Sequence, residues 1–432
     1  MPMAYTSNLS HGVKLTCVKT EKFKTGCLVV NIISGLARET AAATALLPNI
    51  LRRGTAGLPD MERIAAALDE LYGARIEPIV RKKGELHCAG FYCDFPDERF
   101  IQGGSGILDE TAALVGKILL TPDKRDGLFR QDYVESEKSK LIDDIRAGIN
   151  DKRGYSINRL LEEMCAGEPY GVNKLGFEAQ AEEITPESLT AHYHSIISSS
   201  RIEIFYCGSA EPERVESALR QALNGLPERS VLTSPSTEVI LHPASASPRR
   251  FTDTLDVTQG KLAVGFRLGK LPETSDYPAM MVFNAVYGGD ATSKLFLNVR
   301  EKLSLCYYAY SMLDRLKGVM IVASGVEFSK FDNALDEIMA QLGNMKKGEI
   351  TAWELESAKR AVITSIRLAM DRPSGLEELY FDSAVAAVPY DPDGLCEKIE
   401  AVTPDQVVGI ASGIETDSIY YLTGKGGGED SI

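Results

Sequence analysis

The hydrophobic pattern along the chain predicts two similar series of strands and helices. A β-branched run at 28–33 precedes an apolar segment with helical period at about 41–53. The same order returns at 262–268 and at about 277–287. Each apolar segment is followed by a glycine, a common helix stop. We therefore expect a strand and then a helix at the start of each series.

The later part of each series predicts the same further elements. Thr-Pro pairs at 185–186 and 403–404 favour helix starts, because Thr is a good N-cap and Pro suits the first helical position. Gln406 completes a capping box with Thr403. Strands are expected at 85–93, 202–208, 319–326 and 418–424, and long amphipathic helices at about 128–166 and 351–385.

The two series form an internal repeat. Residues 26–40 (GCLVVNIISGLARET) align without a gap with residues 260–274 (GKLAVGFRLGKLPET), and the same displacement carries Gly54 onto Gly288. Strand runs mixed with long helices predict an α+β fold in which each half is a mainly antiparallel sheet packed with helices. The expected division is a half at 1–226, a linker rich in Pro and Ser at 227–250, a half at 251–424 and a flexible tail at 425–432.

Composition excludes several classes of partner. The 432 residues carry a net charge of −14, which disfavours nucleic acids and anionic membranes. No apolar run approaches the roughly 18 residues of a membrane span, and the N-terminal residues do not resemble a secretory signal. The eight cysteines form no CxxC pair, so we expect reduced thiols in the cytoplasm, without disulfides or a zinc knuckle.

Two motifs carry a resemblance to a known family. The segment GGDATSKLFLNVREKLSLCYYAYS (288–311) looks like the second-half signature of the pitrilysin/insulinase/mitochondrial processing peptidase family. The segment ALLPNILRRGT (45–55) lies where active members carry an HxxEH helix. Within the family, the chain is most similar to bacterial members associated with 5-aminopentanol modification of elongation factor P. The resemblance covers nearly the whole chain and implies a clam-shell of two halves.

The zinc site of that family is incomplete in this chain. A catalytic zinc needs about three protein ligands and an open position for water, and the glutamate of HxxEH activates that water. Ala45 and Asn49 occupy the positions of the two histidines, and Pro48 occupies the position of the glutamate. By resemblance, Asp144 falls at the third ligand position and Glu137 at the accompanying glutamate. One carboxylate does not make a site, so we expect no bound metal.

Other chemical signals favour structural roles. His192 and His194 would point about 200° apart on a helix, and a strand would scatter His87, Cys88 and Cys93 between its faces. Gly288-Gly289 is interpreted as a turn because no P-loop Lys-Ser/Thr follows, and neither GxSxG nor GxGxxG occurs. The carboxylates at 135–144 and 353–356 are interpreted as solvated helix faces. No cofactor is expected.

Arg300 and Tyr307 are the candidate substrate-binding residues. They keep the Arg-Tyr spacing of the family signature, with six residues between them. The resemblance implies that this pair contacts the substrate beside a zinc held by another half or subunit. An arginine donates hydrogen bonds to a peptide carbonyl, and a phenol donates to a developing oxyanion. The alternative is that Arg300 forms a surface salt bridge and Tyr307 packs in a sheet.

These features predict a non-catalytic subunit of a heterodimeric peptidase. It would pair with an HxxEH-bearing homologue, or with itself when isolated, and contribute contacts to a closed chamber around a peptide. A first alternative is a scaffold, like the peptidase-dead members of respiratory complexes. A second is a homodimeric binding factor that assists a modification pathway, for example of a translation factor. A third is an active peptidase with a new ligand set.

Overall fold

The computed structural model describes residues 4–229, 231–270, 274–388 and 391–425. The chain divides into two compact units, and each unit is discontinuous in sequence. Unit 1 contains 1–146, 172–236 and 368–390, whereas unit 2 contains 147–171, 237–367 and 391–432. Each unit therefore takes a short segment from the other half of the chain.

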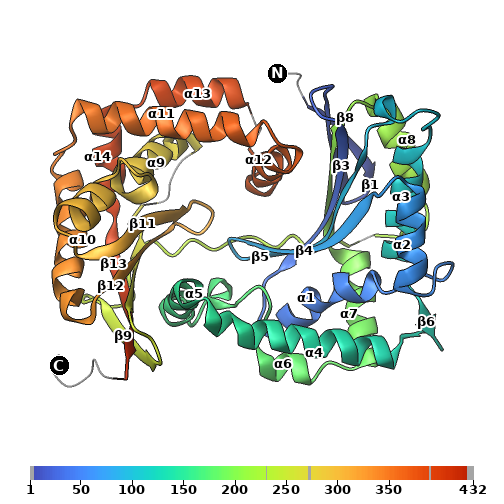
Figure 1. Cartoon of the computed structure of the whole chain (residues 1–432), viewed down its shortest axis with the longest axis horizontal. Coiled ribbons are helices and arrows are strands. Elements are labelled where there is room, and N and C mark those ends of the chain that lie inside the picture. Colours follow the sequence, from blue (N-terminus) through green and yellow to red (C-terminus); the bar gives the residue numbers. More distant parts are fainter. Residues whose placement is uncertain (1–3, 230, 271–273, 389–390, 426–432) are drawn as a thin grey trace. The chain divides into compact units, whose positions relative to one another are not determined.

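Unit 1 is built on a six-stranded sheet with the order β1-β2-β8-β3-β5-β4 (Figure 1). All neighbouring strands are antiparallel except β2 and β8, which are parallel. The strands are β1 (Tyr5–Ser10), β2 (Val13–Lys19), β3 (Thr25–Gly35), β4 (Arg75–Lys83), β5 (Leu86–Pro96) and β8 (Arg201–Gly208). A separate short hairpin joins β6 (Lys124–Arg125) and β7 (Leu128–Phe129).

Helices cover one face of this sheet and close the main core of unit 1. Alternate residues of β3, such as Leu28 and Val30, enter this core, because successive side chains of a strand point to opposite faces. Every helix of this layer contributes buried apolar side chains to the same core. The layer consists of α1 (Ala41–Leu51), α2 (Met61–Glu70), α3 (Ile107–Leu120), α4 (Gln131–Ala147), α6 (Glu178–Glu182), α7 (Pro186–Ser199) and α8 (Pro212–Ala222).

Unit 2 repeats the architecture of unit 1. Its five-stranded sheet has the order β11-β12-β10-β13-β9, and only β13 and β9 are parallel. This order matches β4-β5-β3-β8-β2 of unit 1, including the position of the parallel pair. The strands are β9 (Arg249–Leu255), β10 (Gly260–Arg267), β11 (Cys306–Asp314), β12 (Val319–Val326) and β13 (Glu415–Gly424). The predicted repeat and the α+β class are thus confirmed.

Helices lie on both sides of the unit 2 sheet. On one side α9 and α10 contact the strands, α14 packs on both helices, and α13 packs on α9. In Figure 1, α11 runs beside α13, and Lys359 of α11 donates to the Glu400 carbonyl at the end of α13. These helices are α9 (Tyr277–Asn284), α10 (Phe331–Lys346), α11 (Ala352–Ala369), α13 (Pro392–Glu400) and α14 (Pro404–Gly413).

Two helices are exchanged between the halves of the sequence. Helix α5 (Lys152–Met164) comes from the first half but packs on the free face of the unit 2 sheet. Gly265 on β10 makes room for it, because a Cβ there would overlap the Sδ atom of Met164. Helix α12 (Pro373–Ala386) comes from the second half and packs on the free face of the unit 1 sheet, where Leu376 shares a core cluster with Val29 and Phe205. The exchanged helices thus cover the second face of each sheet.

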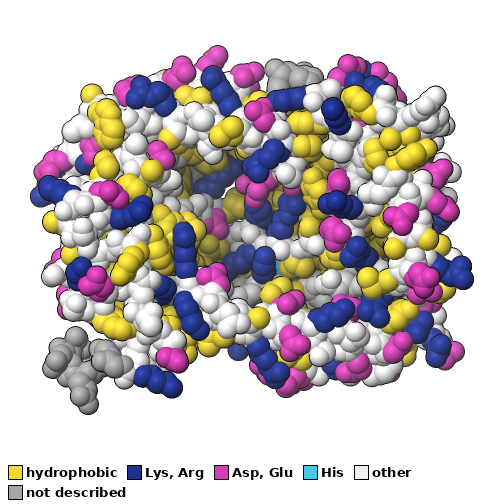
Figure 2. Space-filling model, in the orientation of Figure 1, with side chains coloured by type: hydrophobic (Ala, Val, Ile, Leu, Met, Phe, Trp, Pro, Cys, Tyr) yellow, Lys and Arg dark blue, Asp and Glu magenta, His cyan; other side chains and the backbone are white. Residues whose placement is uncertain are grey.

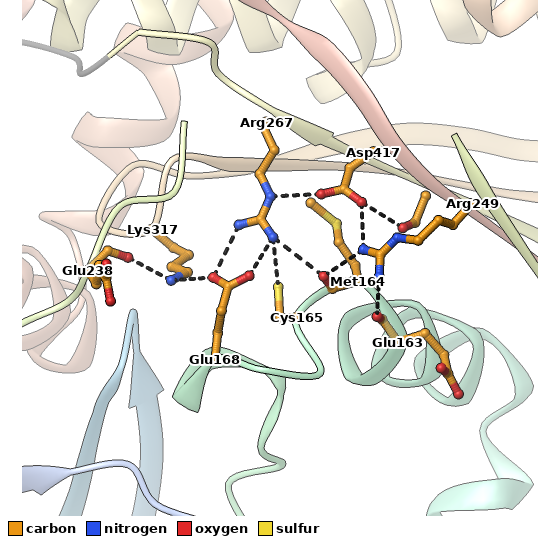
Figure 3. A network of polar contacts seen from close by, with 10 residues as sticks. Glu163, Met164, Cys165, Glu168, Glu238, Arg249, Arg267, Lys317 and Asp417 are labelled. Carbon is orange, nitrogen blue, oxygen red and sulfur yellow. Dashed lines mark hydrogen bonds and ion pairs between the residues drawn. The ribbon is translucent and has the colours of Figure 1, made fainter. Parts of the chain in front are cut away.

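A buried ion network fixes the exchanged segment of unit 2 to its sheet (Figure 3). The guanidinium of Arg267 on β10 lies 2.5 Å from a Glu168 oxygen, and its Nε lies 2.9 Å from Asp417. Lys317 contacts the second Glu168 oxygen at 2.6 Å. Arg249 donates to Asp417 and to the Met164 carbonyl at the end of α5. Segment and sheet are therefore joined by paired charges as well as by apolar contacts.

Most predicted elements are confirmed, but the two long helices are each broken. The predicted helix at 128–166 is α4 and α5, because Asp151 caps a new helix by accepting from the Arg153 and Gly154 amides. The predicted helix at 351–385 is α11 and α12, and Pro373 opens the second of them. The predicted capping box at Thr403 and Gln406 is present in α14.

The glycines at the predicted helix ends have a different role from the predicted one. Helix α1 ends at Leu51, and Gly54 instead allows a close approach of the backbone, since a Cβ there would lie 2.6 Å from the Pro59 carbonyl oxygen. Gly288-Gly289 closes a π-helical segment, Ala285–Gly289, rather than forming a turn. The reason is again close packing, because a Cβ on Gly288 would lie 2.7 Å from the Ser311 amide nitrogen.

The predicted division at 1–226 and 251–424 did not include the exchange of α5 and α12. Within the predicted linker, residues 231–248 form no helix or strand, and β9 begins at Arg249. The predicted tail lies outside the described residues apart from Lys425. None of the helices in the described ranges is long and apolar enough to cross a bilayer. Figure 2 shows basic and acidic side chains interspersed over the face in view.

Candidate functional site

Helix α1 presents the positions of the HxxEH motif in a form that does not suit a metal. Ala45 is 1% exposed and belongs to the unit 1 core, and Pro48 is also buried. Asn49 is exposed. A methyl group and a pyrrolidine ring supply no ligand, and a neutral amide is a poor one for zinc.

Helix α4 brings the two carboxylates of the resemblance to different environments. Asp144 is exposed to solvent. Glu137 is 7% exposed and lies 2.8 Å from Arg53, at the end of α1, and 2.8 Å from Lys140. The Arg53 guanidinium also stacks over the Tyr133 ring, 4.5 Å from its centre. Glu137 therefore joins α4 to the end of α1 through an ion pair, whereas Asp144, at the third ligand position, is a single solvated carboxylate.

His192 and His194 have separate partners in unit 1. His192 shares a hydrogen bond of 2.8 Å with the Thr44 hydroxyl on α1, whereas His194 contacts Lys124 at 3.2 Å. His87 on β5 is fully buried on the same side of the sheet as α1, and burial lowers its pKa to about 4. His192 lies near enough to His87 to affect its pKa, a proximity that the sequence did not reveal. Burial also lowers the pKa of His192, so both rings are neutral at pH 7.

The donor set of this region does not fit a zinc ion. Within residues 4–229 and the other described ranges, no group of three or more His, Cys, Asp or Glu side chains could hold a metal. Cys88 lies on the α12 side of the unit 1 sheet, away from His87, as the strand period predicts. No hydrolytic step through a metal follows from these residues.

Arg300 and Tyr307 lie in unit 2 and line one pocket. The pocket has a volume of about 420 Å³, and its wall also includes Cys306, Glu327 and Lys330. Arg300 belongs to a second π-helical segment, Leu295–Lys302, and Tyr307 belongs to β11. Such π-helical turns are rare and occur often at functional sites. The structure thus brings together the two residues chosen from the sequence.

Backbone irregularities aim Tyr307 into solvent. Cys306 pairs with Val326 and Tyr308 with Gly325, so Tyr307 is the extra residue of a β-bulge in the edge strand β11. Just before it, Ser304 adopts a φ of 50°, a left-handed conformation that is uncommon outside glycine. Bulges redirect side chains and are frequent beside functional sites. As a result Tyr307 is 61% exposed.

The charges of the pocket are largely balanced by local pairs. Arg300 Nε lies 3.5 Å from Glu301, and its guanidinium stacks 4.7 Å from the centre of the Phe296 ring. Lys330 contacts Glu327 at 3.1 Å and donates to the Ser304 carbonyl. The Arg300 side chain remains 42% exposed, so its unused donors are available to a ligand. Burial raises the pKa of Cys306, which keeps this thiol neutral.

The alternative interpretation holds for the neighbouring tyrosines but not for Tyr307. Tyr310 accepts a hydrogen bond of 2.8 Å from Arg153 of the exchanged helix α5. The Arg153 guanidinium lies 4.0 Å from the centre of the Tyr310 ring and 4.7 Å from that of Tyr308. These two rings pack between sheet and helix, whereas Tyr307 does not. For Arg300, the weak contact with Glu301 agrees with the salt-bridge alternative without excluding a ligand.

Sequence reasoning missed the other residues of the pocket wall. Glu327 and Lys330 follow β12, and the antiparallel return of β12 along β11 brings them beside Cys306. The strands at 306–314 and 319–326 are joined by a short turn. Pairing them as a hairpin would therefore have placed Glu327 and Lys330 near Cys306 from the sequence. Arg153 carried no signal, because its position depends on the helix exchange.

Comparison with known proteins identifies the family. Residues 183–362 match the family model described as Peptidase M16 inactive domain. The chain is 32% identical to the "Probable inactive metalloprotease YmfF" of Bacillus subtilis (strain 168), over 98% of this chain and 100% of that protein. It is 22% identical to the "Uncharacterized zinc protease YmxG" of the same organism, over 67% of this chain and 69% of that protein.

A solved structure supports the same assignment. A conserved protein from Enterococcus faecalis V583 superposes with a TM-score of 0.87 and 27% identity, over 98% of this chain and 99% of that chain. The family resemblance expected from the two motifs is confirmed. Since the identity of 32% extends over nearly all of both chains, this protein belongs to the M16 peptidase family, as an inactive, peptidase-like member.

Proposed function

We propose that this chain is the zinc-less subunit of a two-chain peptidase, in which an HxxEH-bearing homologue holds the metal and this chain contacts the peptide. The observation that carries the proposal is the pocket shared by Arg300 and Tyr307. Tyr307 projects from a bulge and is 61% exposed, and Arg300 keeps exposed donors beyond its contacts with Glu301 and Phe296. Exposed functional groups on a distorted backbone are typical of sites that act on a ligand.

The chemistry of the pair suits peptide hydrolysis in a partner's zinc site. A guanidinium has several donors in a fixed fork and can hold a peptide carbonyl in place. A phenol can donate to the oxygen that becomes negative as water attacks the carbonyl, an interaction that strengthens in the transition state. Neither group can activate water by itself, which agrees with a subunit that is inactive alone.

The relatives of this chain support a division of labour. One organism, Bacillus subtilis (strain 168), contains both a relative named as a probable inactive metalloprotease and a relative named as a zinc protease. A chain without the metal ligands and a chain that has them would together supply the complete set of groups.

Co-purification tests the pairing. This chain is expressed with an epitope tag in its native cell at its natural level, and the captured proteins are identified by mass spectrometry. The proposal predicts an HxxEH-bearing homologue in a 1:1 ratio with this chain. Recovery of this chain only with itself, or with a modification enzyme or a translation factor, would contradict the proposal and favour the accessory role.

A further inference from the structure

A second pocket lies in unit 1, far in sequence from Arg300 and Tyr307. Its volume is about 420 Å³, and it is formed by the turn between β1 and β2 and by the segment that follows α8. One part of its wall is apolar and consists of Leu9, Leu223, Leu226 and Pro227. Pockets of about 300–1,000 Å³ with apolar walls and a few polar groups are typical of small-molecule sites.

Arg229 is the unusual member of the wall. It is 5% exposed, and none of its three guanidinium nitrogens has a hydrogen-bond partner among the described residues. A guanidinium is charged at every physiological pH, and a buried charge without a partner is strongly unfavourable. Burial lowers the pKa of Arg229, as expected for a cation that lacks a counter-charge. An anionic partner would remove this cost.

The other charged residues of the wall do not supply that partner. Arg220 is already engaged, because its Nε donates to Glu216 at 2.9 Å and its Nη atoms donate to the Asn8 and Leu9 carbonyls. Glu228 is the one carboxylate of the wall within the described part of the chain, and it is exposed and forms no ion pair with Arg229. Arg229 is therefore the cation of this pocket that remains to be neutralised.

We propose that this pocket binds a ligand in which a carboxylate is attached to a small aliphatic group, with Arg229 as the anion-binding residue. The planar guanidinium fork matches the two oxygens of a carboxylate, and the leucine-lined wall accommodates an aliphatic group. Asn224 and Ser10 supply neutral hydrogen-bonding groups at the same wall. Because the guanidinium nitrogens are shielded, binding requires a small movement of residues 226–229, which form no helix or strand.

Two sources share this chemistry, namely a small free carboxylic acid and the C-terminus of a peptide with an aliphatic last residue. The probes are N-acetyl-leucine, its neutral analogue N-acetyl-leucinamide, inorganic phosphate, and a tripeptide that ends in leucine with a free or an amidated C-terminus. Calorimetry with the full chain measures each affinity. The proposal predicts that both free carboxylates bind at least tenfold more tightly than their amides and than phosphate.

Variants assign the binding to Arg229. Arg229→Met is expected to weaken carboxylate binding at least tenfold, and Arg229→Lys to weaken it less, because the charge remains but the fork is lost. Without ligand, Arg229→Met should be at least as stable as the wild type, since an unpaired buried charge is removed. The matched control is Arg63→Met, at an exposed arginine of α2 that does not line the pocket.

The measured affinities distinguish a small free acid from a peptide C-terminus, and they also show whether the proposal is wrong. A free tripeptide that binds at least tenfold more tightly than N-acetyl-leucine identifies a peptide C-terminus as the ligand. Equal affinities identify a small acid. The proposal is overturned if the wild type binds amides or phosphate as well as carboxylates, if it binds none of the probes, or if Arg229→Met retains wild-type affinity.

Discussion

The guanidinium of Arg267 meets the carboxylate of Glu168 at 2.5 Å, where the segment exchanged from the first half of the chain lies against the central strand of unit 2. Only 3% of the Arg267 side chain and 10% of the Glu168 side chain are exposed. The same carboxylate also holds Lys317, whose side chain is fully buried. Loss of Glu168 would therefore leave two buried cations short of a counter-charge.

Glu168→Gln is expected to destabilise the protein by about 3–5 kcal/mol, because breaking a buried pair leaves uncompensated charge. Urea unfolding followed by circular dichroism measures the change. The control is Glu349→Gln, at an exposed glutamate of unit 2, which should change stability by less than about 0.5 kcal/mol. Equal stabilities of the two variants would show that the network does not hold the exchanged segment.

The stability of unit 2 should fall in acid. Burial alone would raise the pKa of Glu168, but hydrogen bonds from Arg267 and Lys317 outweigh it and lower the pKa. In Asp417 hydrogen bonds from Arg249 and Arg267 likewise outweigh burial and lower the pKa. Their stabilisation is complete above the unfolded-state pKa values of about 4 and is lost as the pH falls through the lower folded-state values. The urea midpoint should therefore decrease below about pH 4, with a shallower decrease in Glu168→Gln. A parallel decrease in both proteins would contradict this assignment.

Two glycines of unit 2, Gly288 and Gly343, should respond to alanine substitution in opposite ways. Gly288→Ala should destabilise the fold by about 1–3 kcal/mol, because the new Cβ would press on the Ser311 backbone. Gly343 lies within α10 with open space around it, so Gly343→Ala should stabilise the helix by about 0.5–1 kcal/mol. Thermal unfolding distinguishes them, and a Gly288→Ala protein as stable as the wild type would show that β11 can move away without cost.

The purified chain should not retain zinc. Of the three ligand positions, Ala45 offers no ligand, Asn49 offers a poor one, and Asp144 is a single exposed carboxylate. After incubation with zinc and dialysis, elemental analysis is expected to find far less than one zinc per chain. Stoichiometric zinc would mean that a ligand set exists outside the positions of the family motif.

The repeat and the central strands of both sheets could be predicted from sequence because their patterns are local, whereas β1, β2, β4 and β9 were not predicted. Strand β12, for example, is a continuous buried run between turn residues, and it was placed at its observed bounds, Val319–Val326. Thr403 and Gln406 gave the start of α14 through contacts only three residues apart. Elements stabilised by contacts close in sequence can therefore be predicted from the local residue pattern.

The exchange of α5 and α12 could not be predicted, because an amphipathic helix has the same pattern whichever sheet it covers. The same limit applies to the candidate site. The spacing of Arg300 and Tyr307 was visible, but the exposure of Tyr307 depends on a one-residue shift in the pairing of β11 with β12. The unpaired burial of Arg229 depends on how residues 226–229 fold back, and no periodic pattern encodes it.

The decisive measurement is hydrolysis of a peptide by this chain mixed with the proposed HxxEH-bearing homologue. We expect the complex to cleave while this chain alone does not, and Tyr307→Phe to lower kcat by about 10²-fold, the usual effect of removing one oxyanion donor. Arg300→Ala should also lower kcat/KM, whereas Tyr72→Phe, at a 54% exposed tyrosine of unit 1, should leave it unchanged. Wild-type activity in complexes with Tyr307→Phe and Arg300→Ala would rule out substrate contact by this pair and leave this chain as a scaffold.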